Sequence, residues 1–179
     1  ACGFWDQMVE GGRSECPDGT QPSYLVDAAR MFVGKDPARF EVVVTSKLFG
    51  DILNDLGAAI AGGMGLAAGA NLNPERRYPS MFEPIHGSAP DIAGKGIANP
   101  MASVWAASQM LDFFGHEDWG ARVLNAIERV LEEGKVLTPD MGDRATASEV
   151  GDAVRDNLAA YKTGKTAVPD RGADSGTDC

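Results

Sequence analysis

The sequence is poor in basic residues and has no long apolar segment. Lysine and arginine number 16 against 26 aspartates and glutamates, which gives a formal net charge of −10 and a pI near 4.6. Nucleic-acid phosphates and anionic membrane surfaces repel such an acidic chain, so neither is an expected partner. No stretch approaches the roughly 18 apolar residues of a membrane span, and no signal peptide is visible. These absences favour a cytoplasmic enzyme or binding domain.

Cysteine is also scarce. Cys2, Cys16 and Cys179 lie near the chain ends, and their spacing fits neither a zinc site nor a disulfide framework. We expect free thiols in a reducing compartment. The chain begins with Ala1 and lacks an initial methionine, which suggests that the 179 residues are a portion of a longer protein.

The sequence does contain a series of helical patterns around one strand-like run. Phe40 to Thr45 is a β-branched run that predicts a buried strand of a parallel sheet. A capping-box pair, Thr146 and Glu149, predicts a helix start. Apolar residues recur at helical spacing over 23–33, 48–60, 101–114, 119–133 and 146–161.

The remaining segments complete a predicted α/β fold. Residues 61–70 are rich in Gly and Ala, which permits close backbone approach, and residues 71–100 have the composition of a long loop. Loops of that length inside a compact domain are usually functional. We predict one domain portion over residues 1–161 and a flexible tail over residues 162–179.

Two carboxylates follow the strand-like run. Asp51 and Asp55 are four residues apart in the next helix, so they share one helix face. Ligands of open parallel sheets bind beyond the carboxyl ends of the strands, and oxygen ligands suit Mg²⁺ or Mn²⁺. The pair predicts a divalent-metal site, although the same spacing is common on solvated helices. Asp27, in an apolar stretch, either binds a cation or points to water or caps a turn.

A second group of polar residues lies in residues 82–100. His86, Asp91 and Asn99 supply directional polar contacts, while the small residues 87–89 let a ligand approach backbone N–H groups. A carboxylate that accepts hydrogen bonds from both ribose hydroxyls favours NAD over NADP. No Gly-x-Gly-x-x-Gly fingerprint opens a helix here, so a dinucleotide would bind this loop differently. Alternatively, His86 is a structural hydrogen-bonding residue.

Three motifs carry a resemblance to a known family. They are Leu-Phe-Gly-Asp-Ile-Leu-Asn-Asp (48–55), Glu-Pro-Ile-His-Gly-Ser-Ala-Pro-Asp (83–91) and Ala-Asn-Pro (98–100). They closely resemble the metal-dependent β-decarboxylating dehydrogenases, which act on isocitrate, isopropylmalate, tartrate or D-malate. Residues 70–75 and 78–84 look most like the tartrate/D-malate branch. The resemblance implies the C-terminal portion of an isopropylmalate dehydrogenase-like α/β fold, with parallel-sheet elements and flanking helices.

The resemblance also implies site residues and ligands. Asp51 and Asp55 match two metal-binding aspartates, and Asp27 matches a third that the neighbouring subunit of a homodimer supplies to a shared active site. Asp91 has the position that marks NAD-preferring members. The implied ligands are NAD, Mg²⁺ or Mn²⁺, and a small 2-hydroxy acid such as tartrate, D-malate or isopropylmalate, which the enzyme would oxidise and decarboxylate. The residues that match the adenosine-binding loop are His86, Gly87, Ser88, Ala89, Asp91 and Asn99.

The chain departs from the family pattern in several places. The family's proton-transferring Lys and Tyr and its substrate-binding arginines would lie before residue 1, so the 179 residues alone are expected to be inactive. Lys47 stands where Asn is usual, and Gly11, Gly12 and Pro22 interrupt a stretch that is normally regular. An alternative is therefore a degenerate, non-catalytic subunit that retains dimerisation and nucleotide binding. A plain helical interaction domain is a third possibility, which the specific loop disfavours.

Overall fold

The computed structural model describes residues 2–13 and 22–160. These residues form two compact units that divide after Ile60, and each unit is described by itself. The expected tail, 162–179, lies outside the described residues, as do Cys16 and Cys179, so those expectations stay predictions. No helix in the described ranges is long and apolar enough to cross a membrane.

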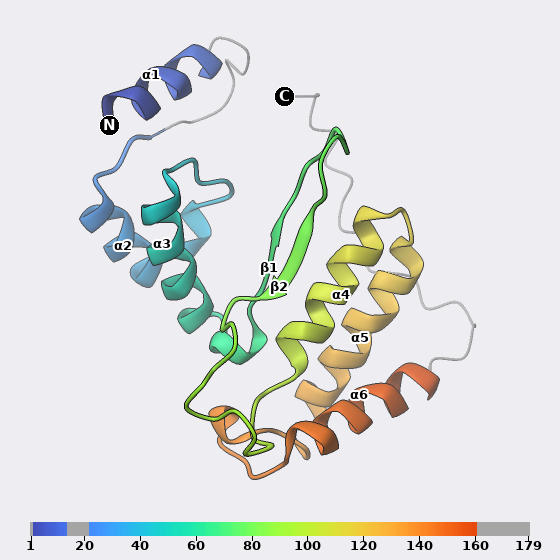
Figure 1. The fold of residues 1–179 in the computed structure, drawn as a ribbon. Helices are drawn as coiled ribbons and strands as arrows, with labels where there is room; N and C mark the ends of the chain where they lie inside the picture. The colour runs from blue at the N-terminus through green and yellow to red at the C-terminus, as the bar shows by residue number, and fades with distance from the viewer. Residues whose placement is uncertain (1, 14–21, 161–179) are drawn as a thin grey trace. The chain divides into compact units, whose positions relative to one another are not determined.

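The described part of the first unit contains three helices, of which α2 and α3 pack against each other (Figure 1). They are α1 (Cys2–Arg13), which accommodates Gly11 and Gly12, α2 (Val26–Lys35) and α3 (Lys47–Ile60). A 3-10 turn (Pro37–Arg39) follows α2. The Tyr24 ring lies 5.5 Å from the Phe32 ring and 5.8 Å from the Phe40 ring between centroids, which ties together the segments on either side of α2. The helices predicted over 23–33 and 48–60 are confirmed.

The predicted buried strand over residues 40–45 is wrong for the described structure. This segment has no regular secondary structure and pairs with no described strand. Val42, Val43 and Val44 are 86%, 49% and 62% exposed. A parallel strand is buried only when neighbouring strands and helices cover it, and the described residues supply no such neighbour. The single described sheet is antiparallel and lies elsewhere in the chain.

The second unit is a β-hairpin on a layer of three helices (Figure 1). Strands β1 (Ala68–Asn71) and β2 (Met81–Pro84) pair antiparallel, with Ala68 opposite Pro84 and Asn71 opposite Met81. The hairpin packs on α4, α4 on α5, and α5 on α6. The helices are α4 (Met101–Phe113), α5 (Glu117–Glu133) and α6 (Ala147–Ala160), as the sequence predicts within a few residues. Their buried core consists of Met101, Ala126, Ile127, Val130, Val150 and Val154.

The expected long loop over residues 71–100 is partly regular, because β2 lies within it. The hairpin tip is held by side chains: Asn73 Oδ1 accepts from the Arg77 N–H at 2.9 Å, and Ser80 Oγ accepts from the Asn73 N–H at 2.9 Å. Arg76 donates to the Phe113 carbonyl at 2.6 Å and lies 5.0 Å from its ring centroid. These bonds fix the hairpin to the end of α4.

The capping box predicted at the start of α6 is confirmed. The Thr146 N–H and hydroxyl donate to Glu149 Oε2 at 2.7 and 2.8 Å, and the Glu149 N–H donates back to Thr146 Oγ1 at 3.3 Å. The backbone N–H of Thr146, and secondarily its hydroxyl, hold the pKa of the Glu149 carboxyl below its ordinary value of 4.5. The ionised carboxylate is therefore the form that caps the helix.

We expect Glu149→Gln to make the free energy of unfolding depend less on pH in the acidic range. Because the pKa is lowered in the folded state, the carboxylate stabilises the fold above a pH of about 4.5, and that contribution is lost as the pH falls through the lower folded-state pKa. Urea unfolding across this range should show the gap between parent and variant closing as the pH falls. Glu132→Gln on α5 is the matched control. A gap that stays constant at every pH would contradict the cap's ionic character.

Candidate functional site

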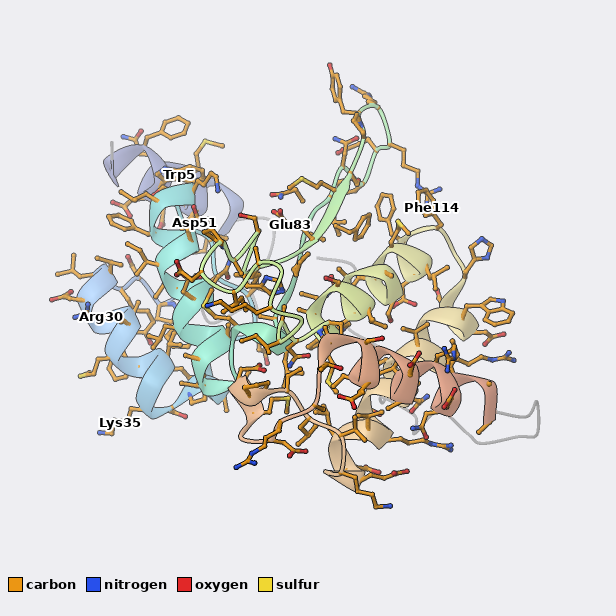
Figure 2. The ribbon with its side chains drawn as sticks, turned by 60° about the horizontal axis from the view of Figure 1, so that its bottom comes forward. Trp5, Arg30, Lys35, Asp51, Glu83 and Phe114 are labelled. Atoms are coloured by element: carbon orange, nitrogen blue, oxygen red, sulfur yellow. The ribbon has the colours of Figure 1, made fainter. Side chains whose placement is uncertain are left out.

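The carboxylates Asp51 and Asp55 lie on α3 in the first unit, and Figure 2 labels Asp51 there. The helix begins where the Gly50 N–H donates to the Ser46 carbonyl at 2.9 Å. Both aspartates are exposed, one helical turn apart, so their oxygens are accessible to a cation. Hard oxygen donors of this kind fit Mg²⁺ or Mn²⁺, which need only one or two protein carboxylates beside water and substrate oxygens.

One of these carboxylates already has a cationic neighbour. The Lys47 ammonium lies 3.1 Å from Asp51 Oδ1 and 3.0 Å from Oδ2, so it contacts both oxygens. The pair is solvent-exposed, with the Lys47 side chain 88% and the Asp51 side chain 61% accessible. The Asp55 carboxylate forms no ion pair or hydrogen bond with any residue in the described ranges. A metal ion that binds Asp51 must therefore displace the Lys47 ammonium, whereas a metal ion that binds Asp55 displaces no cation of the described residues.

The third predicted metal ligand, Asp27, lies in the first turn of α2. It is exposed, and its Oδ1 accepts a hydrogen bond from the Ala28 N–H at 2.9 Å. This local bond matches the expectation that Asp27 caps a turn. It uses one carboxylate oxygen and leaves the other available. Within the described residues, no three Asp, Glu, His or Cys side chains come together as a metal cluster. A shared site with Asp27 of a neighbouring subunit stays a prediction.

The predicted nucleotide loop lies in the second unit, directly after β2, whose Glu83 is labelled in Figure 2. Gly87 and Ala89 have positive φ angles of 63° and 44°. Such a conformation strains alanine, and strain of this kind accumulates where a loop holds a ligand. The N–H groups of Ser88 and Ala89 donate to no described residue. Among the described residues, these two backbone donors have no acceptor, so the turn can offer them to a bound anion or carbonyl.

His86 points one ring nitrogen inward. Its Nδ1 lies 2.8 Å from the Gly87 carbonyl, which fixes the proton on Nδ1 when the ring is neutral. Nε2 is then an acceptor, and it is shielded from solvent without a partner in the described part of the chain. A buried acceptor without a donor is costly, so this atom fits a ligand that donates a hydrogen bond. Asp91, by contrast, is exposed.

Asn99 differs from the other predicted cofactor contacts because its side chain is used inside the fold. It is 6% exposed, donates to Asp140 Oδ2 at 3.1 Å and accepts from the Met101 N–H at 3.0 Å. Its amide nitrogen and oxygen thus both have partners within the second unit. The Asn99–Asp140 bond joins the end of the nucleotide loop to the 3-10 turn Pro139–Met141, the segment that follows α5.

Gly65 is the residue that sequence reasoning missed. A Cβ at this position would overlap Asp140 Oδ2 and lie 2.8 Å from Asn99 Cβ and 2.9 Å from Asn99 Nδ2. Glycine here therefore permits the Asn99–Asp140 bond. The Gly/Ala richness of residues 61–70 was the available signal, since it predicts close approach without saying which glycine needs it.

His86, residues 87–91 and Asn99 all lie in the segment between β2 and α4 of the second unit, and Asp51 and Asp55 lie one turn apart on α3 of the first. A family model described as isocitrate/isopropylmalate dehydrogenase matches residues 1–154. The chain belongs to this family. The three motifs found at residues 48–55, 83–91 and 98–100 all lie inside the matched region.

The relatives of this chain include enzymes named for different activities. The chain is 48% identical over 162 residues to a tartrate dehydrogenase/decarboxylase of Pseudomonas putida, covering 87% of the chain and 44% of the relative. It is 50% identical over 157 residues to a 3-isopropylmalate dehydrogenase of Beutenbergia cavernae, covering 87% and 43%. The chain thus spans less than half the length of the curated family members that it matches.

Solved dehydrogenase structures also resemble this chain in fold. An isocitrate dehydrogenase from Methylococcus capsulatus matches with a TM-score of 0.82 and 39% identity, covering 87% of this chain and 46% of that one. A β-decarboxylating dehydrogenase from Thermococcus kodakarensis matches with a TM-score of 0.73 and 32% identity, covering 88% and 45%. The isocitrate dehydrogenase-like part of the predicted fold is therefore confirmed over part of those chains, although the described portion here is mostly helical.

Proposed function

We propose that this chain is the metal- and nucleotide-binding portion of an NAD-dependent, Mg²⁺- or Mn²⁺-dependent dehydrogenase. Its substrate class is a 2-hydroxy acid such as tartrate, D-malate or isopropylmalate, which is oxidised and then decarboxylated. The observation that carries the proposal is that a chain of this dehydrogenase family keeps Asp51 and Asp55 exposed on one helix face. The chain is about equally similar to a tartrate dehydrogenase/decarboxylase and to a 3-isopropylmalate dehydrogenase. We therefore propose the class of the substrate and not one particular acid.

The proposed roles follow from the donors available. Asp51 and Asp55 would hold the cation, with Asp27 of a neighbouring subunit as a third ligand. A bound Mg²⁺ or Mn²⁺ supplies Lewis-acid polarisation of the substrate hydroxyl oxygen, and NAD⁺ supplies the hydride acceptor. Asp91 would accept hydrogen bonds from ribose hydroxyls, and its charge would repel a 2′-phosphate, which favours NAD over NADP.

The remaining predicted loop residues bind and orient the nucleotide. The N–H groups of Ser88 and Ala89, which donate to no described residue, would donate to its oxygens, and His86 Nε2 would accept a hydrogen bond from one of its N–H or O–H groups. Gly87, which has no side chain, would let the nucleotide approach the loop backbone closely. The backbone of Asn99 would contact the nucleotide at the other end of the loop. No residue among the 179 is assigned to proton transfer.

A homodimer is part of the proposal. Apolar side chains on and beside the first unit's helices are exposed, among them Leu25 (78%), Met31 (55%), Leu48 (67%) and Ile52 (44%). In the described part of this unit, the buried apolar side chains are alanines, Ala29 and Ala58. A second subunit that covers α2 and α3 would bury this surface and bring its own Asp27 to the site.

Metal removal tests the proposed function. The protein that contains this chain should reduce NAD⁺ with tartrate, D-malate or isopropylmalate when Mg²⁺ or Mn²⁺ is present, measured as NADH absorbance. EDTA should abolish the rate and excess Mn²⁺ should restore it, because the cation is needed to polarise the hydroxyl. Turnover that persists in EDTA would contradict the proposal.

A degenerate, non-catalytic subunit is the second candidate function, and the Lys47–Asp51 ion pair favours it because a lysine already occupies a metal-ligand carboxylate. The two candidates differ in binding. Titration calorimetry of the chain with NAD⁺ and with Mn²⁺ should show both ligands binding in an enzyme portion. Nucleotide binding without metal binding would indicate the degenerate subunit.

A further inference from the structure

The ion pair between Lys47 and Asp51 is the feature that the proposed function does not explain. The Lys47 ammonium contacts both oxygens of the carboxylate, at 3.1 and 3.0 Å, and so takes the position from which a cation would be bound. Two further ion pairs of this unit, Arg13 with Glu10 and Arg39 with Asp36, involve none of the predicted metal ligands. Lys47 is thus specific to this carboxylate.

Helix stability does not account for this lysine. Lys47 is the first residue of α3, where the positive end of the helix dipole disfavours a cation. The order within the pair is also the weaker one, because an acid placed four residues before a base stabilises a helix more than the reverse. An exposed pair such as this contributes little to folding in any case. The contact therefore forms and breaks at small cost.

We propose that Lys47 is an internal competitor of the divalent metal for Asp51. This inference rests on the proposed function. The ammonium neutralises the carboxylate, and a divalent cation must displace it and then remain beside a positive charge. Both effects weaken metal binding relative to a chain with a neutral residue at position 47. Lys47 therefore sets the metal affinity of the site without being a ligand or a catalytic residue.

The expected effect of Lys47 on the metal dissociation constant is small, because the charges involved are exposed to solvent. Breaking an exposed pair and holding a positive charge a few ångströms from a divalent ion each cost little in water, and salt screens both. Together they correspond to an increase in the metal dissociation constant of about three- to tenfold. Removing the charge should recover that factor.

Mn²⁺ binding to the 179-residue chain tests the inference without an activity assay. Water-proton relaxation enhancement measures bound Mn²⁺ directly, including weak binding. Lys47→Asn and Lys47→Gln should each bind Mn²⁺ about three- to tenfold more tightly than the parent. Lys47→Arg should bind like the parent, because it keeps the charge. Lys135→Asn is the matched control: Lys135 is an exposed lysine paired with Glu133 at 3.6 Å, and its loss changes the net charge equally.

Asp51→Asn separates the two levels of the proposal. If Asp51→Asn weakens Mn²⁺ binding but Lys47→Asn and Lys47→Gln bind like the parent, the competitor is refuted and the metal site stands. Tighter binding by Lys135→Asn as well would also refute it, since the effect would then be one of net charge. If the parent's Mn²⁺ binding does not depend on Asp51 at all, the proposed metal site fails. Far-ultraviolet circular dichroism confirms that each variant is folded.

Discussion

Gly65→Ala should lower the free energy of unfolding of the second unit by about 2–4 kcal/mol, through overpacking and the loss of buried hydrogen bonds. The added Cβ would overlap Asp140 Oδ2 and come within 2.9 Å of the Asn99 side chain, which is 6% exposed. Asn99 would have to move, and its bonds to Asp140 and to the Met101 N–H would break. The end of the nucleotide loop would then come free of the 3-10 turn Pro139–Met141.

Urea unfolding followed by circular dichroism measures this loss. Gly151→Ala in α6 is the matched control, since a Cβ there meets nothing within 4 Å. The control should raise stability by about 1 kcal/mol, the usual preference of a helix for alanine over glycine. NAD⁺ affinity should fall for Gly65→Ala and stay unchanged for Gly151→Ala. Equal stability changes in the two variants would show that the close approach at Gly65 has no energetic weight.

Asp51→Asn should weaken Mn²⁺ binding by about tenfold or more, because an anionic ligand of a hard cation becomes neutral. The substitution conserves shape and removes only the charge, and Asp51 is exposed, so the fold should not change. Relaxation enhancement at fixed ionic strength gives the two dissociation constants.

Asp156→Asn is the control for that substitution. Asp156 is also an exposed helical aspartate paired with a cation, Arg155, at 3.0 Å. The control should bind Mn²⁺ like the parent. Weakening by the same factor in both variants would mean that Mn²⁺ binds diffusely to an acidic surface, and the α3 site would be wrong.

The features that could be predicted from the sequence depend on residues that lie close together in the chain. The capping box of Thr146 and Glu149, the bounds of α3 to α6, and the shared face of Asp51 and Asp55 all depend on residues three or four apart. Local spacing is a property of the helix itself, so it is visible in the sequence.

The features that could not be predicted depend on distant contacts. The bond from Asn99 to Asp140 joins residues 41 apart in the chain. Gly65, which leaves room for this bond, lies still earlier, so no local sequence pattern predicts the contact. The motif predicts Asn99 as a cofactor contact, whereas the structure shows its side chain bonded to Asp140 and to the Met101 N–H. Val42 to Val44 have the composition of a buried strand, but burial requires neighbouring strands, which the described residues do not include.

Lys47 shows how the two kinds of information combine. The sequence identifies it as a departure from the family pattern, and the structure shows which carboxylate it contacts. Only the distance to Asp51 turns an unusual residue into a hypothesis about metal affinity.

The most direct test of the central claim maps both ligands on the ¹⁵N-labelled chain by nuclear magnetic resonance. Mn²⁺ should broaden amide resonances centred on residues 51–55, and NAD⁺ should shift those of residues 86–99. The acidic cluster around Asp152 and Asp156 provides an internal comparison for nonspecific metal binding. Broadening centred on 152–156 rather than 51–55, or NAD⁺ shifts that leave 86–99 untouched, would contradict the account.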